Sequence, residues 1–433
     1  MPEAKKMVAF SEGLTSTTGI AYLIVLLAAG FLTNFVPTGA VNTGTILLYS
    51  LACLLSFAGG FYLLNPLRKQ IAIAALSILV LSGLAVFKAA FDSNPASQRV
   101  QELVIYFLGA WPFLFFIQIN SPKVRERLLK TLAIGLFGLS AFGIFQSIFA
   151  KSLPLSLFVL QGDHAFGIGD QFRPTGLTGN PIIFSSILVF GSAFFAALWL
   201  EKRTFGFLLA LICSLIANFV TYTRASFILA IPVLILVWLL HNRFRIKHKI
   251  IALVIVVVAV AGGEYVFVNG ADSTMVQRLQ NSDDASLVST LGHFQQIQNA
   301  SDAIVSHPWA GTGMGSQGNS AGPENVIISD GTWWILLLEF GVPLTILIVS
   351  MLLLALIPIS KYVLRPESKN RALAIATLSF HAYILPSNFI NSALLGHISY
   401  ALYWVVLGLS LAAANCDSIP GKQFVHSGSR AYP

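Results

Sequence analysis

Arg224 lies in the stretch NFVTYTRASFILAIP, between two apolar runs that are each long enough to sit in lipid. An unpaired arginine at the centre of a bilayer costs about 2.5–3.5 kcal/mol. Arg224 therefore either lies at a membrane surface or is compensated by an anion. Its residue type and position point to anion recognition at the edge of a membrane.

The composition predicts a membrane protein around this residue. Of the 433 residues, 56% are hydrophobic and 10% are charged, and the mean hydropathy is +0.77. Soluble globular proteins carry about 25% charged residues. Apolar stretches long enough to cross the hydrocarbon core recur along the whole chain, and they predict an all-α, polytopic protein with about 12 spanning helices. We expect residues 1–433 to form one membrane domain. The expected spans are Gly19–Val36, Val41–Leu64, Ile71–Phe91, Leu103–Ile119, Leu132–Ala150, Ile182–Leu200, Phe205–Val220, Ser226–Leu240, Ile250–Val268, Trp333–Ile357, Ala372–Leu385 and Leu394–Ala412.

The basic residues predict the orientation of these spans. Most of the 26 lysines and arginines fall in alternate loops on one side, as Arg68, Arg125, Lys202 and Lys369 do. Cytoplasmic loops are enriched in lysine and arginine, so both termini are expected in the cytoplasm. The net charge of +8 therefore reflects topology, and nucleic-acid binding is not supported.

Motifs for metal, cofactor or redox chemistry are not apparent. The cysteines Cys53, Cys213 and Cys416 have unrelated spacings, which indicate neither a disulfide framework nor a zinc site. The glycine run 311–315 lacks the strand and helix that flank a phosphate-binding loop. We expect no metal and no cofactor.

Four arginines lie on the opposite, outer side: Arg99, Arg173, Arg224 and Arg278. Acidic residues crowd the same side, and loop salt bridges, which are worth little in water, explain Arg99 and Arg278. Arg224 differs because its loop is too short to offer a local acid. A functional role is favoured there.

Two long outer segments accompany these arginines. Residues 151–181 carry His164 and Arg173, and residues 269–331 end with Asp330. In the second segment, apolar residues near 3.6-residue spacing predict an amphipathic helix over about 286–306, with His293 at the margin of its apolar stripe. Loops of this length in a compact protein usually carry function or are disordered, and the helix favours function.

Four segments together resemble the O-antigen ligase and polymerase superfamily (Wzy/WaaL-like) of bacterial enzymes. They are RPTGLTGNPIIFSSIL (Arg173–Leu188), TYTRASFILA (Thr221–Ala230), GHFQQIQNASDAIVSHPWAGTGMGS (Gly292–Ser316) and ISDGTWWILLLEFGVP (Ile328–Pro343). The resemblance implies a GT-C-like membrane enzyme of the bacterial inner membrane whose site faces the periplasm. It also implies a glycan donor on polyprenyl (undecaprenyl) diphosphate, a glycan acceptor and contact with membrane lipids. A chain-length regulator is a further candidate partner.

The resemblance assigns roles to individual residues. Arg173 and Arg224 are expected to bind the diphosphate, because guanidinium groups match phosphate oxygens in a bidentate geometry. Asp330 is the expected base for the acceptor hydroxyl, with His293 as competitor. An N-cap role for Asp330 explains the sequence SDG equally well. His164 and Arg278 are candidate substrate contacts.

The ligase branch usually has an arginine near the start of the outer helix and a histidine just before the returning span. Here those positions hold His293 and Asp330, which favours a polymerase of lipid-linked repeat units. The alternative within the superfamily is a ligase that transfers the glycan to lipid A-core or another acceptor. A flippase or transporter is the alternative from another class, but polar residues concentrate in outer loops and no half-to-half repeat is apparent.

Overall fold

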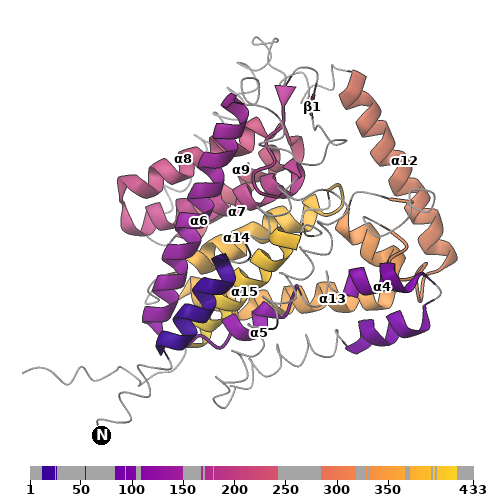
Figure 1. The fold of residues 1–433 in the computed structure, drawn as a ribbon, viewed down its shortest axis with the longest axis horizontal. Coiled ribbons are helices and arrows are strands. Elements are labelled where there is room, and N and C mark those ends of the chain that lie inside the picture. The colour runs from indigo at the N-terminus through magenta and orange to yellow at the C-terminus, as the bar shows by residue number, and fades with distance from the viewer. Residues whose placement is uncertain are drawn as a thin grey trace, which may run out of the picture.

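The computed structural model describes residues 12–24, 26, 54, 83–92, 94–103, 109–149, 167–168, 171–178, 180–241, 284–317, 327–328, 331–365, 371–391, 394 and 397–416. Within these ranges the secondary structure is helical apart from one short antiparallel hairpin, β1 (Gly167–Ile168) and β2 (Gln171–Phe172). The helices gather in one bundle, with α12 at its edge (Figure 1). Their bounds are α4 (Ala96–Leu103), α5 (Pro112–Phe116), α6 (Pro122–Phe149), α7 (Pro181–Lys202), α8 (Phe205–Val220), α9 (Arg224–Leu240), α12 (Asp284–Ser306), α13 (Thr332–Leu364), α14 (Ala372–Ser387) and α15 (His397–Cys416).

Helix length and composition confirm an all-α, polytopic membrane protein. Among the described residues, four helices are long and apolar enough to cross a membrane: α6, α7, α13 and most of α15. Helices α8, α9 and α14 are also apolar but have only 16 or 17 residues. At 1.5 Å per residue they measure about 24–26 Å, less than a hydrocarbon core of about 30 Å. The total number of spans stays a prediction.

Helix α7 forms the centre of the bundle and contacts α6, α8, α9, α14 and α15. Its sequence FSSILVFGSAFFAALW alternates large apolar residues with serine, glycine and alanine, and small residues let neighbouring membrane helices approach closely. A Cβ on Gly191 would come within 3.1 Å of Oγ of Ser214 on α8. Phe184 and Phe194 are fully buried between the helices.

The bundle has two chemically different ends. At one end, Nη1 of Arg371 donates to the carbonyl oxygen of Val363 (2.6 Å), where α13 ends. A carboxylate oxygen of Glu201 accepts from the N–H of Ala372, which joins the end of α7 to the start of α14. Arg125 donates to the carbonyl oxygen of Ala412 near the end of α15 (3.3 Å). This is the end that carries the lysines and arginines expected in the cytoplasm.

Two expected spans have a different internal structure. Residues 109–111 form a turn and the helix after it, α5, ends at Phe116, so Leu103–Ile119 is not one continuous helix. Helix α13 is bent at Gly341, whose φ of +76° is not helical. Because only glycine adopts this conformation readily, Gly341 divides α13 into a short first part and a long second part.

Helix α12 runs from Asp284 to Ser306 and packs against the first part of α13. Ala300 is fully buried with Leu338 of α13, and Ile297 and Ile304 pack at the margin of this cluster. Phe294, on the expected apolar stripe, is 67% exposed. Among the described side chains of the stripe, Ile297 and Ile304 therefore pack against the bundle, whereas Phe294 is mostly exposed.

Candidate functional site

Arg173 directly follows β2 and is fixed onto the turn that joins α8 to α9. Its Nε donates a hydrogen bond to the carbonyl oxygen of Thr221 (2.8 Å), and its Nη2 donates to Oγ1 of Thr223 (3.0 Å). Arg224 is the next residue and the first of α9. The structure therefore brings these two arginines, from segments far apart in the sequence, to one turn.

The turn contains a strained residue and is held by its own side chains. Tyr222 has a φ of +52°, a left-handed conformation that costs an L-residue about 1–2 kcal/mol. Oγ1 of Thr221 donates to the carbonyl oxygen of Asn218 (2.7 Å) and accepts from the N–H of Thr223 (3.3 Å). Burial raises the pKa of the Tyr222 hydroxyl, so this group next to Arg224 is uncharged at neutral pH.

Helix α9 begins without a side-chain cap. Thr223 occupies the N-cap position, but its Oγ1 caps no backbone N–H and accepts from Arg173 instead. The first N–H groups of a helix have no partner within it, and together with the helix dipole they favour an anion. Arg224 is the first residue of this helix.

A buried cluster of four hydroxyl groups lies directly under the turn. Ser226 Oγ is 2.7 Å from Oγ of Ser185 and 2.8 Å from the hydroxyl oxygen of Tyr383, which is 2.7 Å from Oγ of Ser186. All four residues are at most 1% exposed. The cluster joins α7, α9 and α14 within the first turn of α9, two residues after Arg224.

The start of α13 is attached to the end of the same α14. Thr332 Oγ1 donates to Oδ1 of Asn388 (2.7 Å), and the N–H of Trp333 donates to the Asn388 carbonyl oxygen (3.1 Å). The indole Nε1 of Trp333 donates to the carbonyl oxygen of Leu385 (2.9 Å), and that of Trp334 to Phe389 (3.0 Å). These bonds give the tryptophan pair a structural role, because they join the start of α13 to the end of α14.

Three helix starts therefore lie at the end of the bundle opposite Arg371. They belong to α7, α9 and α13. Asn180 caps α7, because its Oδ1 accepts from the N–H of Ile182 (2.8 Å). Each helix start carries a partial positive charge. Together with Arg173 and Arg224 they make this end suited to a polyanion.

Asp330, His164 and Arg278 lie outside the described residues. The N-cap position of α13 is Gly331, which has a φ of +96° and no side-chain cap. The N-cap role considered for Asp330 is therefore wrong in position. Thr332, two residues after Asp330 in the sequence, is bound to Asn388 at the end of α14.

His293 is held by a different element. It lies on α12, half-buried, four residues before Ile297 and so on the face that packs toward α13. The arginine turn is instead attached to α7 and α14 through the hydroxyl cluster. The structure thus attaches Arg173 to the turn that precedes Arg224, whereas His293 lies on α12.

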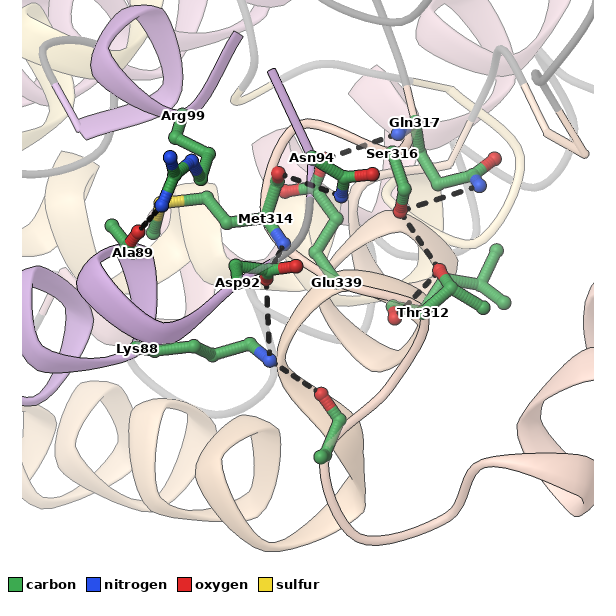
Figure 2. Close-up of polar contacts among 12 residues, drawn as sticks. Lys88, Ala89, Asp92, Asn94, Arg99, Thr312, Met314, Ser316, Gln317 and Glu339 are labelled. Carbon is green, nitrogen blue, oxygen red and sulfur yellow. Dashed lines mark hydrogen bonds and ion pairs between the residues drawn. The ribbon is translucent and has the colours of Figure 1, made fainter. Parts of the chain in front are cut away.

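The glycine run after α12 packs against α13 and the segment 83–94. Gly311 and Gly313 have positive φ, and a Cβ would overlap the carbonyl oxygen of Leu338 at the first and the carboxylate of Asp92 at the second. Asp92 accepts from the N–H of Met314 (2.6 Å), and Asn94 donates to the Met314 carbonyl oxygen (3.0 Å) (Figure 2). These glycines allow close backbone packing, in line with the weak sequence case for a phosphate loop.

The bonds of Asp92 and Asn94 to Met314, which we call the clamp of Asp92, were not predicted from the sequence. Nζ of Lys88 donates to the carbonyl oxygen of Ala310 (2.6 Å) and lies 3.8 Å from a carboxylate oxygen of Asp92. Glu339 is 0% exposed and accepts from the N–H of Gln317 (3.2 Å). The sequence shows Lys88 and Asp92 four residues apart at a span end, which indicates a local ion pair. It does not indicate their other partners, Ala310 and Met314, which lie more than 200 residues later.

The fold is that of a polytopic membrane protein, and Arg173 and Arg224 meet at one turn of its helix bundle. Residues 209–349, from within α8 to within α13, match the family Wzy_C, described as O-antigen ligase. For this segment, the match confirms the resemblance to the O-antigen ligase and polymerase superfamily. The match does not separate the polymerase from the ligase branch. A comparison with curated proteins gave no match.

The matched segment includes Arg224, His293 and Asp330, whereas Arg173 precedes it. The family supports an enzyme of glycosyl transfer that acts on lipid-linked glycans. Arg173, Tyr383 and Asp92 lie outside the matched segment, but each makes a hydrogen bond with a residue within it.

Proposed function

We propose that the protein is a glycosyltransferase that polymerises lipid-linked oligosaccharide repeat units. It transfers a glycan from polyprenyl (undecaprenyl) diphosphate to an acceptor sugar hydroxyl at the outer face of the bacterial inner membrane. The observation that carries this proposal is the attachment of Arg173 to the turn that begins α9 at Arg224. The turn lies at the end of the bundle opposite the basic end, which agrees with an outer site and cytoplasmic termini.

The geometry of the turn suits a diphosphate. Two guanidinium groups supply planar, bidentate donors, and the uncapped start of α9 adds backbone N–H groups. Helices α8 and α9 are too short to lift their turn far beyond the hydrocarbon core. The cations therefore lie near the level of lipid headgroups, where the diphosphate of a membrane-anchored donor is presented.

The reaction breaks the bond between the anomeric carbon and the diphosphate oxygen. The acceptor oxygen forms the new bond to that carbon, and the electron pair of the broken bond stays on the diphosphate. Fixed cations stabilise the charge that develops on this leaving group, so Arg173 and Arg224 supply the charge that a metal ion supplies elsewhere. Direct attack inverts the configuration at the anomeric carbon.

The acceptor hydroxyl loses its proton to a base, for which we propose Asp330. Gly331 and Thr332 are fixed beside the end of α14, whose Tyr383 contacts the first turn of α9. The attachment of these neighbours of Asp330 to the helix that also contacts α9 supports the proposal. His293 on α12 is the second candidate, and His164 and Arg278 are proposed substrate contacts.

Reconstitution tests the function directly. Purified protein in lipid vesicles receives a polyprenyl-diphosphate-linked repeat unit, and the glycans are resolved by length. Longer lipid-linked glycans support a polymerase. Transfer only to added lipid A-core supports the ligase alternative, and redistribution of unchanged donor between leaflets supports a flippase.

A further inference from the structure

The hydroxyl of Tyr383 lies between two helices that carry the proposed site. It is 2.8 Å from Oγ of Ser226 on α9 and 2.7 Å from Oγ of Ser186 on α7, and all three side chains are buried. Ser226 lies in the first turn of α9, two residues after Arg224. The bond to Tyr383 therefore fixes the height and rotation of the helix start that bears Arg224.

The same helix holds the other part of the site. Asn388, at the end of α14, binds Thr332 through its side chain and Trp333 through its carbonyl oxygen. Five residues separate Tyr383 from Asn388, which is about 7.5 Å along a helix. One short part of α14 thus contacts both the arginine turn and the start of α13, directly after Asp330.

A second buried tyrosine provides a comparison within the protein. The hydroxyl of Tyr403 on α15 is 2.9 Å from Nε2 of His381 on α14. Both tyrosines are buried and each makes hydrogen bonds between helices. That bond joins α15 to α14 and reaches neither α9 nor the start of α13. Tyr403 therefore joins two helices through a buried hydroxyl, as Tyr383 does, but it is not connected to the arginine turn.

We propose that Tyr383 is a positioning residue for glycan transfer, which sets the arginine turn in register with the start of α13. This inference rests on the proposed function. Tyr383 does not touch the reacting atoms, and it acts through the hydroxyl of Ser226 and through the end of α14. Because displacements of about 1 Å can lower a rate by a factor of about 100, losing this hydroxyl slows transfer even when the fold persists.

The test compares Tyr383→Phe with Tyr403→Phe in vesicles supplied with radiolabelled polyprenyl-diphosphate-linked repeat unit. We expect Tyr383→Phe to lower kcat by a factor of roughly 10–100 with little change in donor KM, because the diphosphate still meets both arginines. Tyr403→Phe keeps its kcat. An unchanged kcat in Tyr383→Phe, or an equal loss in both variants, overturns the inference.

A double-mutant comparison separates positioning from stability. In protein that already carries Arg224→Lys, Tyr383→Phe should cause little further loss, since the group it aligns has lost its geometry. A loss by the same factor in both backgrounds would mean that the hydroxyl only supports the fold. If Tyr383→Phe is not recovered folded, Ser226→Ala removes the same bond from the side of α9.

These outcomes also distinguish the two proposals. If Arg224→Lys transfers glycan at the normal rate, the proposed function fails whatever Tyr383 does. If Arg224→Lys is impaired and Tyr383→Phe is normal, only the positioning role fails.

Discussion

Arg173 donates a 3.0 Å hydrogen bond from Nη2 to Oγ1 of Thr223, the residue that precedes α9. An arginine from one outer segment thus fixes the start of a helix whose first residue is another arginine. Two cationic residues on one turn favour the binding of an anion, which is the kind of ligand that the proposed reaction requires.

Replacing Arg224 by lysine should abolish most of the transfer. A lysine keeps the charge but loses the planar fork, so it stabilises the leaving diphosphate less well. We expect kcat to fall by a factor of roughly 100 or more, measured as radiolabelled product per minute in vesicles. Arg127→Lys, an exposed change at the basic end of the bundle, serves as the control and should keep the normal rate. A normal rate in Arg224→Lys contradicts the diphosphate role.

Replacing Thr223 by valine should weaken the site without removing either arginine. The substitution deletes the acceptor of Nη2 of Arg173 while it preserves the side-chain volume. We expect a loss of about 1–2 kcal/mol in transition-state stabilisation, a factor of about 5–30 in kcat/KM. Donor titrations in vesicles measure it.

The matched control is Thr345→Val in α13. Thr345 is also buried, but its Oγ1 has no hydrogen-bond partner among the described residues. This variant should be as active as the original protein and at least as stable, because a buried hydroxyl without a partner contributes nothing. Equal losses in the two variants would show that the Arg173 bond is not responsible.

The sequence predicted the parts of this site that depend on local pattern. Hydropathy predicted the helices, and the charge asymmetry separated Arg173 and Arg224 from the basic end. The repeat of apolar residues indicated a helix close to the observed bounds of α12, Asp284–Ser306. Each of these features follows from the periodicity or the sign of neighbouring residues, which a single sequence contains.

Contacts between distant segments were not predictable in the same way. The acceptor of Nε of Arg173 is the carbonyl oxygen of Thr221, and every residue has such an oxygen. Tyr383 looks like any apolar helix residue until Ser186 and Ser226 are seen beside its hydroxyl. Asp92 looks like a residue at a span end, yet its partner is the N–H of Met314.

Replacing Asp330 by asparagine tests the proposed base. Asparagine is similar in shape but does not take up the acceptor proton, so kcat should fall by a factor of about 100–10,000. The N-cap position of α13 belongs to Gly331, and the variant should therefore keep its thermal stability. Asp302→Asn, an exposed change on α12, is the control. If Asp330→Asn is fully active and His293→Gln is inactive, the base is His293.

Replacing Gly311 by alanine should destabilise the outer region. Gly311 has a φ of +70°, and a Cβ there overlaps the carbonyl oxygen of Leu338, a backbone atom that cannot rotate away. The left-handed conformation alone costs alanine about 1–2 kcal/mol, and the overlap adds to it. We expect a lower Tm in detergent. Size-exclusion chromatography of samples heated to increasing temperatures measures it.

Gly138→Ala provides the opposite result for the same substitution. Gly138 lies within α6, and a Cβ there meets nothing within 4 Å. Alanine should stabilise this helix by about 0.4–1 kcal/mol because it restricts the unfolded chain, so Tm should rise or stay level. Since Gly311 holds the loop against both α13 and the clamp of Asp92, Gly311→Ala should also reduce transfer. A Gly311→Ala protein as stable as Gly138→Ala would mean that the glycine run does not lock the outer helix to the bundle.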